Sequence, residues 1–264
     1  MVARTLKILA AGALAAALSA GTAAAADTVK VGVTGGPHAE IMEKVAEVAA
    51  KDGLTVEIIE FSDYVLPNTA LNDGDLAANS FQHQPYLDNQ IRDRGYEIAT
   101  VAKTVVFPMG LYSKKIDDLA KLEDGATVAI PNDPTNGGRA LLLLESAGLI
   151  DVDDAAGLKA TPLDVVKNDK NLKFQELDAA QLPRSLDDVG VAAVNTNYAM
   201  SAGLDPKKDS IFIEKPESPY VNIVAVRTAD KDAPWVATLV KAYHSEAVKQ
   251  FIDQRFGKSV VTSW

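Results

Sequence analysis

The sequence predicts an α/β fold built on a mostly parallel sheet. Segments with the two-residue period of a strand alternate along the chain with segments that have the 3.6-residue period of a helix. Chains with this alternation form parallel sheets covered by helices. The 264 residues are 47% hydrophobic and 23% charged, which is enough apolar material for one large or two smaller cores.

Residues 1–26 have the layout of a secretory signal peptide. Arg4 and Lys7 precede an apolar run, and small residues end the segment before Asp27. The apolar run is shorter than the roughly 20 residues that span a bilayer. Cleavage after Ala26 removes two positive charges and moves the net charge from −10 to −12. We therefore expect an exported acidic protein, for which nucleic acid and anionic membranes are poor partners.

The mature chain is predicted to open with two strands joined by a well-marked helix. Ile41 and Val45 recur on one face of this helix while charged residues lie outside it, and Gly53 can end it. The elements expected here are a strand at 28–33, the helix, a strand at 54–61 and a short helix at 63–71.

A polar and aromatic cluster at residues 79–88 follows a short buried strand. It places Phe81, His83 and Tyr86 among hydrogen-bonding side chains, and Pro85 can begin the next helix. The cluster thus lies where a strand gives way to a helix, the usual ligand-binding edge of an open α/β sheet. A corner whose aromatic residues belong to the core would produce the same pattern.

The second half of the chain continues the alternation. Residues 96–112 are too long for one strand and are interrupted at Pro108 and Gly110, so we expect two strands with a connection between lobes. The other expected strands are at 127–130, 172–176, 191–194, 210–213 and 221–226, and the expected helices are at 140–147, near 179–186, from 198, and at 234–256.

Residues 132–139 predict an anion site. Gly137 and Gly138 would let the backbone approach a ligand, and the following helix offers unpaired amides with Arg139 in its first turn. The sequence has no G-x-G-x-x-G or Walker lysine, so a carboxylate is favoured over a pyrophosphate. A helix start capped by Asp133 or its neighbours, with Arg139 in solvent, would also explain these residues.

Two asparagines follow or interrupt apolar strands. Asn195 comes directly after residues 191–194, and Asn222 lies within residues 218–223. An amide beside an apolar strand has to be hydrogen-bonded, and a ligand ammonium or carboxylate can supply the partner. Turn formation is the alternative role for both.

Motifs for catalysis or metal binding are missing from the sequence. There is no cysteine, no G-x-S-x-G elbow and no S-x-x-K, and the three histidines lie far apart. Asp73, Asp75 and Asp88 could hold a hard cation, but their spacing does not fit an EF-hand loop. We expect a protein that is not an enzyme and that has no metal and no cofactor.

Several blocks of the chain together resemble the methionine-binding lipoprotein family, the substrate-binding components of ABC importers. The match spans nearly the whole mature chain, in order and with small gaps. The blocks are residues 61–68, 79–88 with 94–96, 113–116, 128–136, 181–188 and 217–222.

The resemblance implies a two-lobed periplasmic-binding-protein fold, type II-like, with the ligand cleft between the lobes. The first lobe would comprise residues 27–108 and 227–264, and the second residues 109–226. The resemblance also implies that Arg139 holds the ligand carboxylate. The ligand-binding residues it implies are Tyr64, Phe81, His83, Tyr86, Asn136, Arg139, Asn195 and Asn222.

On this basis we expect a monomeric periplasmic protein that captures methionine, in its L form, and delivers it to an ABC permease in the inner membrane. Members of the family typically end their signal in a lipidated cysteine, and this chain has none, so we expect it not to be lipid-anchored. The alternatives are another apolar amino acid, D-methionine or a methionine dipeptide as ligand. More distant alternatives are a secreted hydrolase that uses His83 as base, and an adhesion or signalling module that has lost transport.

Overall fold

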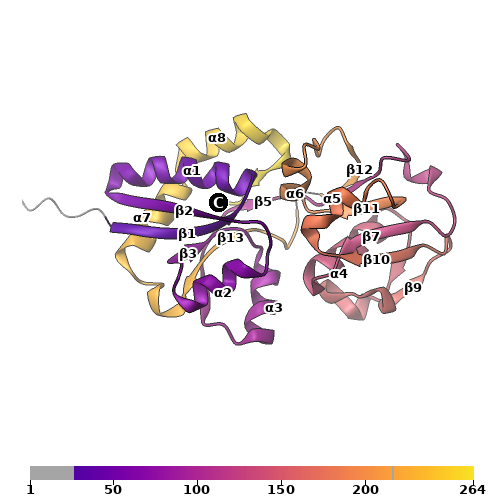
Figure 1. The fold of residues 1–264 in the computed structure, drawn as a ribbon, viewed down its shortest axis with the longest axis horizontal. Coiled ribbons are helices and arrows are strands. Elements are labelled where there is room, and N and C mark those ends of the chain that lie inside the picture. Colours follow the sequence, from indigo (N-terminus) through magenta and orange to yellow (C-terminus); the bar gives the residue numbers. More distant parts are fainter. Residues whose placement is uncertain (1–26, 216) are drawn as a thin grey trace, which may run out of the picture.

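The computed structural model describes residues 27–215 and 217–264, and the predicted signal peptide, residues 1–26, lies outside them. The described chain forms two lobes that lie side by side, each built around a five-stranded sheet (Figure 1). No helix within the described ranges is both long enough and apolar enough to cross a membrane. The predicted two-lobed α/β fold is therefore confirmed.

The sheet of the first lobe has the strand order β2 (Leu54–Phe61), β1 (Asp27–Thr34), β3 (Ala78–Asn79), β13 (Ile223–Arg227) and β4 (Ile98–Lys103). β1 is parallel to β2 and β3, whereas β13 is antiparallel to β3 and β4. Alternate valines of β1, Val29, Val31 and Val33, are buried in the core of this lobe, as the strand period predicts.

The helices of the first lobe are α1 (Pro37–Ala49), α2 (Leu66–Asp73), α3 (Gln84–Arg94), α7 (Pro234–Tyr243) and α8 (Glu246–Phe256). The prediction of one continuous helix over 234–256 is wrong, because the chain breaks between α7 and α8. The Ser245 hydroxyl accepts a hydrogen bond from the backbone N–H of Val248 at 3.3 Å and so caps the start of α8.

The sheet of the second lobe has the strand order β10 (Lys173–Leu177), β7 (Thr127–Pro131), β11 (Val191–Val194), β6 (Gly110–Tyr112) and β12 (Ser210–Ile213). β7 is parallel to β10 and β11, and β6 is antiparallel to β11 and β12. This lobe also contains α4 (Pro134–Ser146), α5 (Leu182–Ser185), α6 (Thr196–Ser201) and the small pair β8 (Asp151–Val152) and β9 (Val165–Lys167).

The chain crosses between the lobes twice. The first crossing leads from β5 (Val105–Val106) to β6, and the second from β12 to β13. β14 (Val261–Thr262) pairs with β5, so the last described strand also belongs to the first lobe. Because β13 belongs to the first sheet, the predicted lobe boundary at residue 226 falls inside a strand of the first lobe, and the second crossing ends before Ile223. The rest of the predicted division into lobes stays a prediction.

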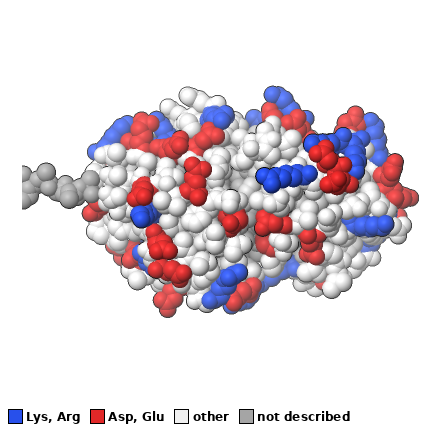
Figure 2. Space-filling model, in the orientation of Figure 1, with Lys and Arg blue, Asp and Glu red and all other residues white. Residues whose placement is uncertain are grey.

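Acidic and basic side chains are interspersed over both lobes on the face drawn in Figure 2. The formal net charge of the whole chain is −10. A mixed surface with an acidic balance keeps a protein soluble but does not form the clustered positive field that attracts a phosphate backbone.

Candidate functional site

A cavity with about 350 Å³ of empty space, part of which is open to solvent, lies between the two lobes. Most of its walls come from residues that follow the carboxyl ends of β1, β2 and β3 in the first lobe and of β7 and β11 in the second, and the two crossings add Phe107 and Asn222. This is the sheet edge at which ligands bind in open α/β folds. All of the predicted ligand-binding residues line it: Tyr64, Phe81, His83, Tyr86, Asn136, Arg139, Asn195 and Asn222. Their contact with a ligand stays a prediction.

One side of the cavity is aromatic. The ring centroids of Tyr64, Phe81 and Tyr86 are 6.0–6.1 Å from one another, with Phe81 and Tyr86 edge to face. The Tyr86 hydroxyl donates to the backbone carbonyl of Tyr64 at 2.9 Å, within the first lobe. Burial raises the pKa of both tyrosines well above the usual value, so both hydroxyls remain donors. This wall suits an apolar, polarisable ligand group.

The Tyr64 hydroxyl connects the two lobes. It donates to Asn197 Oδ1, on α6 of the second lobe, at 2.6 Å. Beside it the ring of Tyr198 lies 4.8 Å from that of Tyr64, and the Tyr198 hydroxyl donates to the carbonyl of Ser62 at 3.3 Å. The lobes therefore touch directly through side chains at this end of the cavity.

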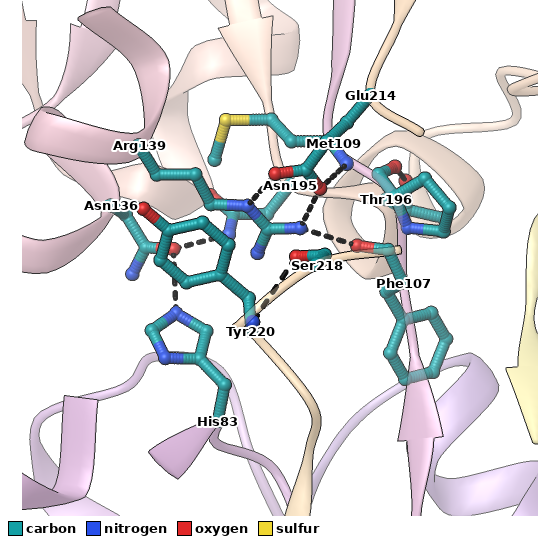
Figure 3. Close-up of polar contacts among 11 residues, drawn as sticks. His83, Phe107, Met109, Asn136, Arg139, Asn195, Thr196, Glu214, Ser218 and Tyr220 are labelled. Atoms are coloured by element: carbon teal, nitrogen blue, oxygen red, sulfur yellow. Dashed lines mark hydrogen bonds and ion pairs between the residues drawn. The ribbon is translucent and has the colours of Figure 1, made fainter. Parts of the chain in front are cut away.

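His83 has a fixed tautomer. Its Nδ1 accepts a hydrogen bond from the backbone N–H of Tyr86 at 3.1 Å, which caps α3, so in the neutral ring the proton must be on Nε2. Nε2 then donates to Asn136 Oδ1 at 3.2 Å, across the lobe interface (Figure 3). Burial, and then the positive charge of Arg139, lower the pKa of His83 to about 3. Since neither ring nitrogen has a free lone pair, the arrangement does not favour His83 as a hydrolytic base.

His38 belongs to the cavity although we predicted no contact for it. Its Nδ1 lies 2.8 Å from Thr34 Oγ1 and its Nε2 lies 3.2 Å from Asn222 Oδ1, while its ring packs on Phe107 at 4.6 Å. Burial lowers the pKa of His38 to about 4. His38 thus holds the Asn222 amide in place as a neutral group. The available signal was its position, directly after β1 at the start of a helix.

Three asparagine amides of the second lobe, Asn136, Asn195 and Asn197, form the polar side. Asn136 Oδ1 accepts from both His83 Nε2 and Asn195 Nδ2, the latter at 2.8 Å. Asn195 Oδ1 and Asn197 Nδ2 are buried without a hydrogen-bond partner among the described residues. A buried acceptor and a buried donor left unpaired each cost about 1–3 kcal/mol. An ammonium and a carboxylate of a ligand would supply the missing partners.

The start of α4 differs from the predicted anion site. The helix begins at Pro134, so Arg139 is in its second turn and not in its first. Asp133 caps the helix, with Oδ1 accepting from the backbone N–H of Asn136 at 2.9 Å, as in the alternative we considered. The Asp133 carboxylate therefore occupies the position that a ligand anion would take at this helix start.

Gly137 and Gly138 serve packing rather than close approach of a ligand. A Cβ at Gly137 would lie 2.9 Å from the carbonyl oxygen of Pro131, and one at Gly138 would lie 2.6 Å from that of Leu158. Both neighbours are backbone atoms, which leave no room for a side chain. The two glycines let α4 sit against the end of β7 and the segment at 158–160.

Arg139 is buried, with 3% of its surface exposed, and both crossings contact it. Nε donates to Glu214 Oε1 at 3.1 Å and Nη2 donates to Glu214 Oε2 and to the carbonyl of Phe107, the latter at 2.8 Å (Figure 3). The guanidinium carbon lies 4.3 Å from the centroid of the Tyr220 ring. No hydrogen bond of Nη1 is found among the described residues. The alternative of a solvated Arg139 is wrong, and sequence reasoning missed its partner Glu214.

Other residues of the cavity were also missed. Besides His38, they are Gln82, Phe107, Thr196 and Asn197. The Gln82 amide donates to Asn68 Oδ1 at 2.7 Å and to Asn79 Oδ1 at 3.0 Å, so it supports the wall from behind. Within residues 27–215 and 217–264 no group of three or more His, Cys, Asp or Glu side chains is placed to hold a metal ion.

The chain is similar to proteins of known structure and name. The model of the NlpA lipoprotein family matches residues 29–264. The sequence is 52% identical over 240 residues to the D-methionine-binding lipoprotein MetQ of Escherichia coli, covering 89% of this chain and 88% of that protein. A nutrient binding protein from Burkholderia cenocepacia, solved bound to methionine, has a TM-score of 0.88 and 54% identity over 89% of this chain and 100% of its own. A periplasmic substrate-binding protein of an ABC transporter from Coxiella burnetii has a TM-score of 0.86 and 52% identity over the same shares.

Proposed function

The chain belongs to the NlpA lipoprotein family, and from that premise we propose that it captures methionine between its lobes and delivers it to an ABC permease. Its relatives are named as binding proteins, so the prediction that it is not an enzyme is confirmed. The observation that carries the proposal is the cavity itself, which combines an aromatic wall with unpaired amide atoms and a buried guanidinium.

The chemistry of methionine matches the two sides of the cavity. Its thioether would lie against Tyr64, Phe81 and Tyr86, and each favourable sulfur–aromatic contact contributes about 0.3–1.5 kcal/mol. Its carboxylate would pair with Arg139 Nη1, since charge-assisted hydrogen bonds are the strongest available. Its ammonium would donate to Asn195 Oδ1, which is a buried acceptor without a partner among the described residues.

Tight binding is feasible for so small a ligand. Methionine has about nine non-hydrogen atoms, and a ceiling near −1.5 kcal/mol per atom allows roughly −13 kcal/mol, which corresponds to nanomolar affinity. Such affinity requires that the protein enclose the ligand. The contacts between the lobes through Tyr64, His83 and Tyr198 support a closed state that does so.

We propose L-methionine as the ligand, with D-methionine as the second candidate because relatives carry that name. Methionine dipeptides and other apolar amino acids are the remaining alternatives. The proposed partner is an inner-membrane permease, and the proposed state is a monomer. The relatives are named lipoproteins, whereas this sequence contains no cysteine to carry a lipid, so we propose that it acts unanchored in the periplasm.

The experiment that tests this function is thermal unfolding of mature protein refolded free of carried-over ligand. A ligand at about 1,000 times its dissociation constant adds roughly 4 kcal/mol and raises the midpoint by several degrees. The panel contains L- and D-methionine, leucine, norleucine and methionine dipeptides. A rise of the midpoint with L-methionine supports the proposal. A larger rise with another compound would identify that compound as the ligand, and no rise with any compound refutes the binding function.

A further inference from the structure

We propose that Glu214 sets the charge of the ligand cavity, so that the site selects zwitterionic amino acids over carboxylate anions of the same shape. This inference rests on the proposed function, because it concerns how the same cavity discriminates among methionine-like ligands.

Glu214 is fixed opposite Arg139 by both crossings. It follows β12 at the start of the second crossing, and its carboxylate accepts from Nε and Nη2 of Arg139 (Figure 3). Oε2 also accepts from the backbone N–H of Met109 at 3.2 Å, and the Glu214 N–H donates to the carbonyl of Met109 at 2.8 Å. The carboxylate therefore has one well-defined position, on the side of the guanidinium away from Nη1.

Arg139 is the one formally charged residue among those that line the cavity. His38 and His83, which also line it, are neutral near pH 7 because burial lowers their pKa values to about 4 and 3. Asp133 lies behind Asn136 and caps α4, and its carboxylate acts on the cavity residues Tyr64 and Tyr86. The Asp133 contribution is the same in every variant compared below, so changes at Glu214 report on the charge of the Arg139–Glu214 pair.

The pairing has a direct consequence for ligand choice. An unpaired buried guanidinium attracts any carboxylate, and an anion gains more from it than a zwitterion of zero net charge. With Glu214 in place the pair is neutral, so the long-range attraction for anions is cancelled while Nη1 still provides a donor to a nearby carboxylate. A neutral site that offers both a donor and the acceptor Asn195 Oδ1 fits an amino acid better than its des-amino analogue.

Glu214→Gln tests this inference with three ligands that share the thioether chain and differ in charge. They are L-methionine, the anion 4-(methylthio)butanoate and the cation L-methioninamide, titrated by calorimetry at pH 6, where an α-amino group is protonated. In the variant, we expect the affinity for the anion to rise roughly tenfold relative to the affinity for methionine. The affinity for methionine should in turn rise roughly tenfold relative to the affinity for the cation.

The matched control is Glu217→Gln, which removes the same charge from an exposed residue of the same crossing. We expect it to leave both ratios unchanged. Glu214→Asp keeps the charge and should also keep the wild-type ratios, so it provides a test that remains if Glu214→Gln does not fold.

An unchanged ratio of anion to methionine in Glu214→Gln would overturn the inference, because a residue that only positions Arg139 weakens both carboxylate ligands alike. Such a residue would also shift the ratio of methionine to the cation against methionine, since L-methioninamide has no carboxylate to lose its partner. A tenfold shift of the ratios in Glu214→Asp or in Glu217→Gln would also overturn it. Failure of wild-type protein to bind methionine would instead refute the proposed function, so the two failures are distinguishable.

Discussion

Replacing Tyr64 by Phe removes a single hydroxyl that connects the two lobes. In the wild-type protein this hydroxyl donates to Asn197 Oδ1 at 2.6 Å. The variant keeps the aromatic ring in the cavity wall, so its contact with a ligand side chain is preserved. Any loss of affinity then reports on closure of the lobes rather than on the apolar pocket.

The magnitude follows from the two groups involved. A hydrogen bond contributes about 0.5–1.5 kcal/mol, and a buried acceptor left unpaired costs about 1–3 kcal/mol. Asn197 lies in the cavity wall and its Nδ2 is already without a partner among the described residues. We therefore expect closure to weaken by about 1–2 kcal/mol, which lowers methionine affinity about 5- to 30-fold.

Calorimetric titration with methionine measures the affinity, and displacement kinetics measure the dissociation rate, which should account for most of the change. The control is Tyr86→Phe, because the Tyr86 hydroxyl donates to the Tyr64 carbonyl within the same lobe at 2.9 Å. It removes a hydroxyl from the same aromatic wall without removing a contact between lobes. Equal losses in the two variants would refute the assigned role of the Tyr64 hydroxyl.

Three further predictions follow from the cavity. Phe81→Leu keeps an apolar wall but removes the ring, so selectivity for methionine over norleucine should fall about 2- to 10-fold in calorimetric titrations; unchanged selectivity would contradict a sulfur–aromatic contact. Arg139→Ala should weaken methionine binding by about 2–5 kcal/mol. A loss below about tenfold would contradict its role, and the exposed Arg94→Ala serves as control. The pKa of His83 is lowered from 6.5 to about 3, and that of His38 is lowered from 6.5 to about 4. Between pH 6.5 and these values the unfolded chain binds more protons than the folded protein, so the free energy of unfolding falls as the pH drops. Thermal midpoints measured from pH 7 to pH 4 should therefore decline. His83→Asn, which can still cap α3, should make this decline less steep. An equally steep decline in the variant would refute the lowered pKa of His83 as a cause of the pH dependence.

Much of the candidate site could be predicted because its residues follow strands. Phe81 and His83 come after β3, and Asn195 comes after β11, where parallel strands direct their carboxyl ends to one edge. The resemblance to a family then indicated which of these edges face one another. Local patterns could not predict hydrogen bonds between residues far apart in the sequence, such as Arg139 with Glu214 or His38 with Asn222. The residues around each of these side chains carry no information about which distant residue it contacts.

The wrong predictions have local physical causes. Gly137 and Gly138 suggested a loop, and the helix was therefore predicted to start at Ala140, yet close packing against Pro131 makes glycine suitable inside α4. Residues 221–226 were predicted as a strand, and the observed strand covers Ile223–Arg227, but a mostly apolar strand fits either sheet equally well. Its pairing with β3 and β4 is decided by tertiary contacts, which is why the predicted boundary fell inside it.

The first lobe contains both ends of the described chain, since β1 starts at Asp27 and β14 pairs with β5. Fluorophores attached at the two ends would therefore move as one body when the lobes open, and energy transfer between them would not report on ligand capture. A sensor needs one dye at an end and the other on the second lobe. Leu163, which is 95% exposed and is not among the residues that line the cavity, offers an attachment point there.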